Sequence, residues 1–170
     1  MTVNQLLAHA RSACGLKIRY RLGGGNTNPQ APSPAGEDGS CDCSAFVCWA
    51  LRIRKYQPDF SWLRNLNGGW MNTDGMWVDA RNEPTGFFQK IQKPELGVIV
   101  VYPAQWVSKL QGPKVGHVGI VSEVVDGTAT RAIHCSAGNF KVGGDAIAEN
   151  SASIFLKQDA TIFARCVTVE

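Results

Sequence analysis

Residues 41–47 read Cys41-Asp42-Cys43-Ser44-Ala45-Phe46-Val47 and stand where a loop rich in Gly, Pro and Ser runs into an apolar segment. Asp42 is a favourable N-cap residue, so the stretch predicts a helix whose first residue is Cys43. We expect this helical region to end at Pro58. Apolar residues recur on the Cys43 side of the helix at 3.6 residues per turn, namely Phe46, Val47, Ala50 and Leu51. This face is therefore predicted to be buried, with the thiol at its rim.

The position of Cys43 in this helix favours a reactive thiol. A side chain in the first turn of a helix faces unpaired backbone N–H groups and the positive end of the helix dipole. Both features favour the thiolate over the thiol, and the thiolate is the nucleophilic form of cysteine. We therefore predict Cys43 as a nucleophile.

The rest of the chain predicts helices first and strands afterwards. Residues 3–14 have helical spacing of apolar residues, 17–22 are extended, and the following loop continues to residue 40. A tryptophan-rich segment, 60–86, predicts short helical turns within a loop. Strands are predicted over 98–102, 116–125, 128–135, 154–156 and 162–169. This order is typical of an α+β fold in which N-terminal helices pack on a central antiparallel sheet. A chain of 170 residues is expected to form a single domain over 1–170.

The dipeptide Asp126-Gly127 lies between strand-forming residues and predicts a two-residue hairpin turn. Val125 then pairs with Thr128. Counting outward from this pair places Glu123 opposite Thr130. The hairpin therefore sets the register of two long strands, and each of these strands contains one histidine.

The same register brings the two histidines to one face of the sheet. It places Gly119 opposite His134 and His117 opposite Ser136, and side chains alternate between faces with a period of two. His117 and His134 become diagonal neighbours about 7 Å apart, so we predict a hydrogen bond between their rings. The apolar residues predicted to fill a core on the opposite face are Val118, Ile120 and Ile133.

Together these residues predict a cysteine hydrolase. Cys43 attacks an amide carbonyl, and His117 takes the thiol proton and later returns it to the leaving amine. His134 orients His117 and fixes its tautomer. The backbone N–H of Cys43 is the expected donor to the oxyanion.

With these residues in place, the chain resembles the NlpC-type family of papain-like cell-wall cysteine peptidases. Four segments carry the resemblance in the order that the family has them. They are 19–24 with Tyr20 in a Tyr-x-x-Gly-Gly pattern, 42–47 with Ala45 in place of the motif's glycine, 116–121 around His117, and 132–134 ending at His134. The resemblance implies a papain-like fold with Cys43, His117 and His134 as catalytic residues. It also implies Tyr20, Asp42 and Ser44 as substrate-binding residues.

The substrate implied by this resemblance is peptidoglycan or a muropeptide, cleaved in the stem peptide and commonly at the γ-D-glutamyl bond to the diamino acid. An N-acetylmuramoyl-L-alanine amidase of the CHAP type shares the Cys–His chemistry and is the nearest enzymatic alternative. A non-catalytic cell-wall binding module with the same fold is another alternative. No cofactor is predicted.

Composition limits the other classes of function. The net charge of +3 is too small to indicate a nucleic-acid-binding protein, and no apolar run is long enough to span a membrane. Residues 1–11 do not form a secretion signal, so we expect synthesis without a leader. The protein would then be cytoplasmic or would reach the cell wall by a non-Sec route, as an antibacterial effector or a phage lysin. An effector would also have an immunity protein as a partner.

The six cysteines leave two further interpretations open. If Cys43 is a free thiol, at most two disulfides can form, and Cys41 is a candidate for a disulfide or for oxidation. Cys41, Cys43 and Cys48 also offer soft ligands for zinc, together with His134 and Cys135. Their spacing matches none of the usual paired Cys-x2–4-Cys motifs, so no metal site is predicted.

Overall fold

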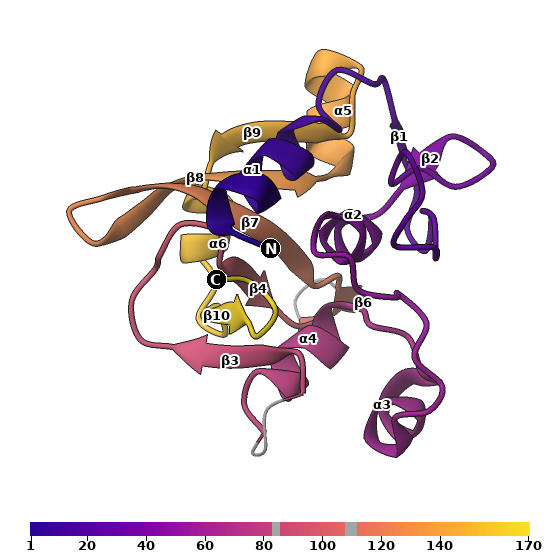
Figure 1. The fold of residues 1–170 in the computed structure, drawn as a ribbon, viewed down its shortest axis with the longest axis vertical. Helices are drawn as coiled ribbons and strands as arrows, with labels where there is room; N and C mark the ends of the chain where they lie inside the picture. Colours follow the sequence, from indigo (N-terminus) through magenta and orange to yellow (C-terminus); the bar gives the residue numbers. More distant parts are fainter. Residues whose placement is uncertain (83–85, 108–111) are drawn as a thin grey trace.

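A six-stranded antiparallel sheet forms the centre of the molecule (Figure 1). The computed structural model describes residues 1–82, 86–107 and 112–170. The strand order is β3-β10-β4-β7-β8-β9. These strands are β3 Phe88–Ile91, β4 Ile99–Tyr102, β7 His117–Val125, β8 Thr128–Cys135, β9 Ile147–Ser151 and β10 Ile162–Cys166. Two smaller ladders pair β1 Arg19–Tyr20 in parallel with β2 Ser40–Cys41, and β5 Gln105–Val107 antiparallel with β6 Gly112–Lys114.

Helices cover both faces of this sheet. The helix α2 packs on β7 and β8, α1 packs on α2, and α4 contacts β4, while α6 lies against β4 from the other side. In the described residues the helices are α1 Val3–Arg11, α2 Cys43–Ala50, α3 Ser61–Asn67, α4 Thr73–Asp79, α5 Ala137–Gly143 and α6 Ser153–Leu156. The α+β class and the packing of N-terminal helices on a central antiparallel sheet are therefore confirmed.

Each face of the sheet has its own apolar core, because strand side chains alternate between faces. The larger core lies under α1, α2 and α4 and includes Val118, Ile120 and Ile133, as predicted. The smaller core lies under α6 and includes Phe155 and Tyr102. The two histidines belong to the second face, so they lie opposite the larger core.

The register of β7 and β8 agrees with the prediction at both ends of the hairpin. Val125 pairs with Thr128, and Ile120 pairs with Ile133, which is the register that brings His134 beside Gly119. The predicted pairing of Glu123 with Thr130 is wrong, because Glu123 pairs with Arg131 next to a β-bulge. The bulge is local, and the register returns to the predicted one before the histidines.

The first helix begins at a capping box and is shorter than predicted. The Thr2 hydroxyl accepts a hydrogen bond from the Gln5 backbone N–H, and the Gln5 side chain accepts one from the Thr2 backbone N–H. The helix ends at Arg11 rather than near residue 15. The backbone N–H of Val3 donates to the carbonyl of Glu170 at 3.0 Å, so the two chain ends lie side by side (Figure 1).

Some predicted elements are wrong. The segment 154–156 belongs to the helix α6 rather than to a strand, because its one buried side chain, Phe155, covers the sheet face beside the histidines. The helix that starts at Cys43 ends at Ala50, well before Pro58, and Arg52 follows in the left-handed region at φ 59°. The last strand ends at Cys166. The strands β3 and β9 were not predicted.

The tryptophan-rich segment forms α3 and α4, with residues 83–85 outside the described part of the chain.

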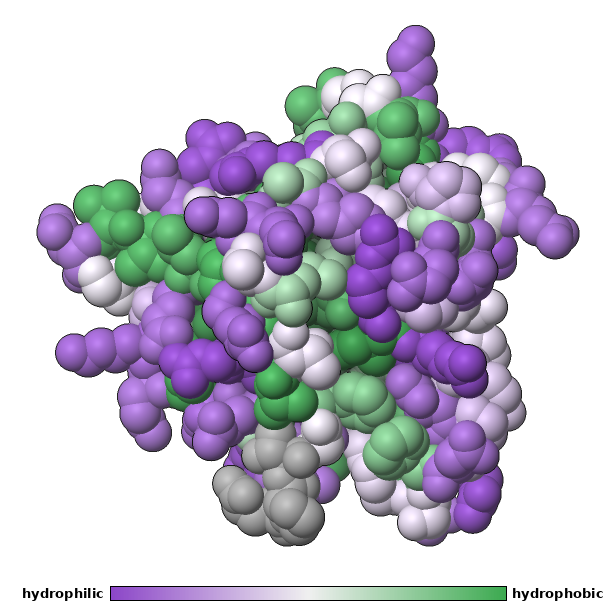
Figure 2. Space-filling view, viewed as in Figure 1, coloured by the Kyte–Doolittle hydropathy of each residue, from purple (hydrophilic) through white to green (hydrophobic). Residues whose placement is uncertain are grey.

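Polar side chains prevail on the face shown in Figure 2, and apolar ones follow the β7–β8 hairpin, where Val125 is half exposed. Among the described residues, no helix has the length and apolar character needed to span a membrane.

Candidate active site

The candidate nucleophile occupies the predicted place at the first position of α2. The Asp42 N-cap is extended, and its Oδ1 accepts a hydrogen bond from the Ala45 backbone N–H at 2.7 Å. Cys43 is 3% exposed and lines a cavity of about 270 Å³. The backbone N–H of Val118 lies near its sulfur and favours the thiolate. Because Val118 directly follows His117, the thiol lies beside the β7 backbone next to that histidine.

Burial of Cys43 opposes ionisation of its thiol to the thiolate. Removal of the sulfur from water and, to a lesser degree, the charge of Asp42 raise the pKa of Cys43 to about 12. The backbone N–H groups of Val118 and Ser44 act in the opposite direction but more weakly. Desolvation of the charged form therefore outweighs the favourable field at the helix N-terminus. In the resting protein Cys43 is a thiol and needs a base.

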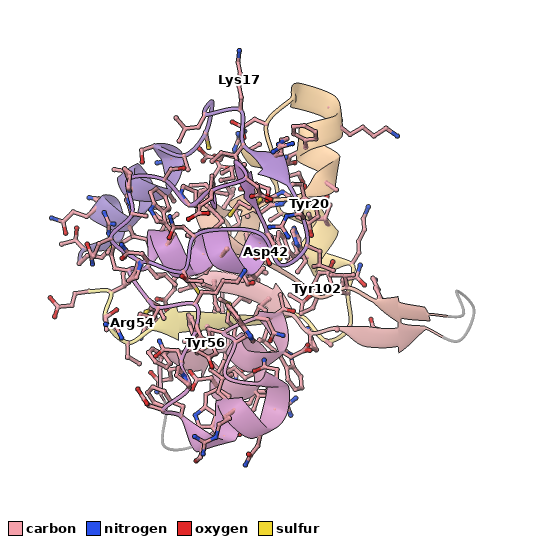
Figure 3. The ribbon with its side chains drawn as sticks, turned by 90° about the vertical axis from the view of Figure 1, so that its right-hand side faces the viewer. Lys17, Tyr20, Asp42, Arg54, Tyr56 and Tyr102 are labelled. Atoms are coloured by element: carbon pink, nitrogen blue, oxygen red, sulfur yellow. The ribbon has the colours of Figure 1, made fainter. Side chains whose placement is uncertain are left out.

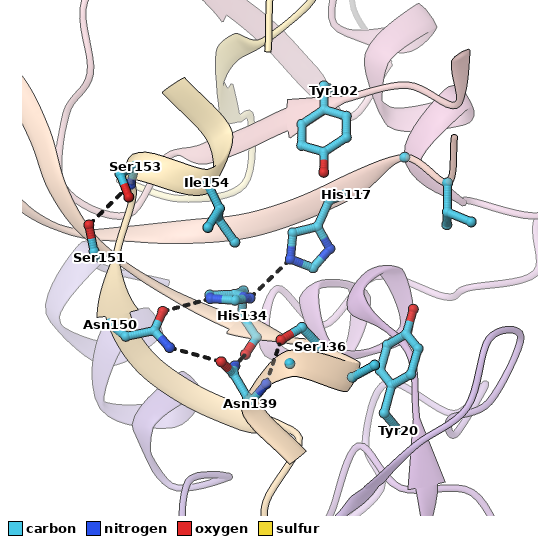
Figure 4. A pocket seen from close by; sticks show the side chains of 14 residues that line it. Tyr20, Tyr102, His117, His134, Ser136, Asn139, Asn150, Ser151, Ser153 and Ile154 are labelled. Carbon is cyan, nitrogen blue, oxygen red and sulfur yellow. Dashed lines mark hydrogen bonds between the residues drawn. The ribbon is translucent and has the colours of Figure 1, made fainter. Parts of the chain in front are cut away.

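The predicted contact between the two histidine rings is present. His117 Nε2 and His134 Nδ1 are 2.9 Å apart, and the rings are perpendicular to each other (Figure 4). The Phe155 ring stacks on His117 with a centroid distance of 5.0 Å and meets His134 edge-on. A side chain at Gly119 would clash here, since an added Cβ would lie 3.0 Å from Phe155 Cζ and 3.1 Å from His134 Cβ. Gly119 thus leaves the space that the three rings occupy.

Both histidines are neutral in the resting structure. Burial and, to a lesser degree, the neighbouring His134 lower the pKa of His117 to about 3. Burial also lowers the pKa of His134, although the hydrogen bond that its Nε2 donates to Asn150 acts in the opposite direction. A neutral imidazole and a neutral thiol are the correct protonation states for transfer of the thiol proton to the base.

Two cavities meet beside the nucleophile. The cavity at Cys43 shares Val115 and Gly116 with a second one of about 500 Å³ that contains both histidines and Tyr20. Figure 3 views this side of the molecule, with Tyr20, Asp42 and Tyr102 labelled. Tyr20 and Tyr102 lie on either side of the histidine pair in Figure 4. Together the two cavities provide space on both sides of an amide bond held at Cys43.

The carboxylate of Asp42 is occupied by groups of the protein itself. Oδ1 accepts from the Ser44 hydroxyl at 2.9 Å as well as from Ala45, and Oδ2 accepts from the Gly23 backbone N–H and from Lys55 Nζ. Lys55 also donates to the carbonyl of Gly24. Asp42 and Ser44 line the cavity at Cys43, but their polar groups hold the loop at Gly23 and Gly24 against the start of α2.

Ala45, which stands where the NlpC-type motif has glycine, packs against Gly25. An added Cβ at Gly25 would lie 2.2 Å from the Ala45 Cβ and 3.3 Å from the Cys41 sulfur, and Gly25 has a φ of 112°. Only glycine fits this position without strain. The loop before α2 therefore makes room for the methyl group that the motif lacks.

The cysteines do not form a metal site in the described residues. No group of three or more His, Cys, Asp or Glu side chains in 1–82, 86–107 and 112–170 is arranged to hold a metal ion. The Cys48 sulfur points toward the carbonyl of Met71, and the Cys135 sulfur toward the carbonyl of Cys41. All six cysteines are free thiols.

Four residues of the site were not predicted from the sequence. Lys55 pairs with Asp42, and Phe155 stacks on His117, although neither belongs to a motif. Asn139 and Asn150 extend the histidine pair by further hydrogen bonds. Asn150 lies on a strand, 147–151, that was not predicted, because the polar residues of this segment do not alternate with apolar ones.

Comparison with known proteins concerns the fold and the family of the chain. No curated protein matches the chain. Among solved structures, the crystal structure of Ly7917 matches with a TM-score of 0.53 and 20% sequence identity, over 96% of this chain and 62% of that one. This chain thus spans less than two thirds of Ly7917, and the likeness supports the shared fold.

The family model that matches is the CHAP domain, over residues 34–139. CHAP domains are papain-like cysteine peptidase or amidase domains that act on peptidoglycan. The matched residues include Cys43, His117 and His134. The papain-like class expected from the sequence is confirmed, whereas the assignment to the NlpC-type family is not. The chain belongs to the CHAP domain family.

Proposed function

We propose that this protein hydrolyses amide bonds in the stem peptides of bacterial peptidoglycan, with Cys43 as nucleophile and His117 as base. One observation carries the proposal. The buried thiol at the start of α2 lies beside the residue after His117, and the cavities lined by Cys43 and by His117 share Val115 and Gly116. An amide bond spanning these cavities would lie between the nucleophile and its base.

The chemistry follows from the neutral pair. His117 Nε2 is engaged by His134, so Nδ1 is the atom left to accept the thiol proton as sulfur attacks the carbonyl carbon. The oxyanion is stabilised by the Cys43 backbone N–H, which has no acceptor inside the helix. The C–N bond then breaks, the amine leaves with the proton from His117, and a thioester remains. Water deprotonated by His117 attacks the thioester, releasing a carboxylic acid and the Cys43 thiol.

Two amide bonds are candidates for the substrate. The resemblance of the four sequence segments favours the γ-D-glutamyl bond to the diamino acid. The CHAP family match favours equally the N-acetylmuramoyl-L-alanine bond, because that family includes amidases. Tyr20 lines the histidine cavity and is proposed to bind substrate, and Asp42 and Ser44 shape the cavity at Cys43. We also propose that the protein reaches the cell wall in one of two ways. It is delivered as an antibacterial effector, with an immunity protein as partner, or it is released as a phage lysin.

Fragment analysis tests the proposal and separates the two bonds. Purified peptidoglycan is incubated with the protein, with Cys43→Ala as the blank, and soluble products are identified by mass spectrometry. A peptidase releases fragments cut within the stem, whereas an amidase releases whole stems and leaves glycan strands without peptides. Binding to peptidoglycan without any product that the blank lacks would contradict hydrolysis and indicate a binding module.

The pH dependence of hydrolysis should reflect the buried base. Because the pKa of His117 is lowered to about 3, the base stays neutral well below its ordinary value of 6.5. We expect the acid limb of kcat/KM, which reports the base of the free enzyme, to lie clearly below pH 6.5. The measurement is kcat/KM on a soluble muropeptide between about pH 4 and pH 8. An acid limb at or above pH 6.5 would contradict a desolvated base.

A further inference from the structure

Four polar side chains form a continuous hydrogen-bonded chain at the floor of the histidine cavity (Figure 4). It runs from His117 to His134, then to Asn150 on β9 and Asn139 on α5. We propose that Asn150, held by Asn139, is a positioning residue that selects the tautomer of His134 and thereby leaves Nδ1 of His117 free to act as the base. The role of His117 as a base rests on the proposed function, whereas the position of the proton on His134 does not.

The orientation of Asn139 is set by backbone carbonyls. Its Nδ2 donates to the carbonyl oxygens of His134 at 3.0 Å and Ala146 at 3.2 Å. A carbonyl oxygen only accepts hydrogen bonds, so the amide nitrogen must face these two groups and Oδ1 must face away. The Asn139 backbone N–H also donates to the Ser136 hydroxyl, which caps α5 and holds the residue in place.

The orientation of Asn150 follows from that of Asn139. Asn139 Oδ1 can only accept, so the Asn150 atom 2.8 Å away from it is the amide nitrogen. Asn150 Oδ1 then faces His134 Nε2 at 2.7 Å. Because an amide oxygen cannot donate, His134 must have its proton on Nε2.

The proton on His134 Nε2 fixes the direction of the hydrogen bond between the two histidines. Burial keeps His134 neutral, so with a proton on Nε2 its Nδ1 has only a lone pair. The atom 2.9 Å from that lone pair, His117 Nε2, must therefore donate its N–H. Neutral His117 then has its lone pair on Nδ1. The opposite tautomer of His134 would place the proton of His117 on Nδ1, where it could not accept the proton of the thiol.

A neutral amide suits this role in a buried site. A carboxylate in the same position would favour the imidazolium forms by its charge, whereas Asn150 fixes direction without adding charge. His134 Nδ1 still accepts from His117 Nε2 once His117 is protonated, so the arrangement also stabilises the imidazolium formed during attack on the carbonyl. The strand β9 provides Asn150, which pairs with Ala132 on β8, the strand that contains His134.

The third histidine offers an internal reference for the test. His9 Nδ1 lies 3.1 Å from the carbonyl oxygen of Ala50, and this oxygen can only accept. His9 is therefore expected to have its proton on Nδ1, opposite to His117 and His134. Nitrogen-15 NMR of the resting protein distinguishes protonated from unprotonated ring nitrogens without any substrate. We expect Nε2–H signals for His117 and His134 and an Nδ1–H signal for His9. An Nδ1–H signal for His134 in the wild-type protein would overturn the proposal.

Two substitutions at Asn150 test the catalytic consequence. Asn150→Leu removes the acceptor, and we expect both tautomers of His134 and a fall in kcat of about 10–100-fold with KM little changed. Asn150→Asp keeps the acceptor for His134 Nε2 but loses the donor to Asn139 Oδ1, so a single tautomer and a kcat above that of Asn150→Leu should return at some cost in thermal stability. The added negative charge should shift the acid limb of kcat/KM to higher pH. The control is Asn4→Leu, the same substitution at an exposed position of α1 that lines neither cavity, and we expect its kcat to match that of the wild type.

These readouts separate this inference from the proposed function. A wild-type protein with the expected NMR pattern but without products from peptidoglycan would contradict the function and leave the tautomer assignment intact. Asn150→Leu with an unchanged NMR pattern and kcat within about twofold of wild type would overturn the positioning role while hydrolysis stands. Thermal unfolding of each variant shows whether a loss of kcat reflects loss of the fold.

Discussion

Cys43→Ala is expected to abolish the release of peptidoglycan fragments, with a fall in kcat of about 10⁵–10⁶-fold. The reason is chemical, because without the sulfur no thioester forms and the neutral His117 has no acidic group to activate. Removal of one sulfur atom from this site costs little stability, since the thiol forms no ion pair and its helix is capped by Asp42. The measurement compares initial rates of fragment release, and circular dichroism confirms the fold.

The same helix provides a matched control. Cys48 lies on α2, is 1% exposed, and packs into the larger core away from both cavities. Cys48→Ala removes the same atom, and we expect kcat within about twofold of wild type and a loss of about 1 kcal/mol in the free energy of unfolding. Equal loss of kcat in the two variants would point to a general requirement for intact packing. Full activity of Cys43→Ala would refute its role as nucleophile.

Lys55→Met is expected to lower the free energy of unfolding by about 3–5 kcal/mol. Lys55 Nζ lies 2.9 Å from Asp42 Oδ2, and each of the two side chains is 6% exposed. Methionine keeps the length of the apolar stem but leaves the buried carboxylate of Asp42 without its counter-charge. Since Asp42 also caps α2 and binds the Gly23 backbone, the loss should loosen the loop next to Cys43 and lower kcat.

Denaturant unfolding followed by tryptophan fluorescence measures this effect. The control is Lys90→Met on the edge strand β3, where the side chain is exposed, and we expect a change within about 0.5 kcal/mol. The double variant Asp42→Asn with Lys55→Met removes both charges and should recover part of the stability lost in Lys55→Met. A loss below about 1 kcal/mol in Lys55→Met would show that Asp42 does not depend on this ion pair.

The predictable parts of the fold are those encoded by neighbouring residues. The Asp42 cap places the start of α2 at Cys43, and the Asp126-Gly127 turn sets the register that brings the histidine rings together. The period-two alternation also separates Val118 and Ile120, in the larger core, from His117 on the opposite face. Each of these depends on local hydrogen bonding or on strand periodicity, which a sequence displays directly.

The parts that were not predicted depend on distant partners. The strand β9 contains polar residues, yet it forms because β8 offers a free edge to pair with. The segment 154–156 reads as a strand from its composition, but Phe155 must reach the sheet face beside the histidines, and a helical turn places it there. Tertiary packing overrides local preference in both cases.

The sequence by itself determined the α+β class, the position of Cys43 at a helix start and the shared face of His117 and His134, because short-range geometry governs all three. Only the tertiary structure decided the protonation states, since burial raises the pKa of Cys43 and lowers that of His117 through contacts with the whole fold. It likewise decided the pairing of Lys55 with Asp42 and the approach of Asn150 to His134. These contacts join residues 13 and 16 positions apart in the chain, and only the packed molecule brings their side chains together.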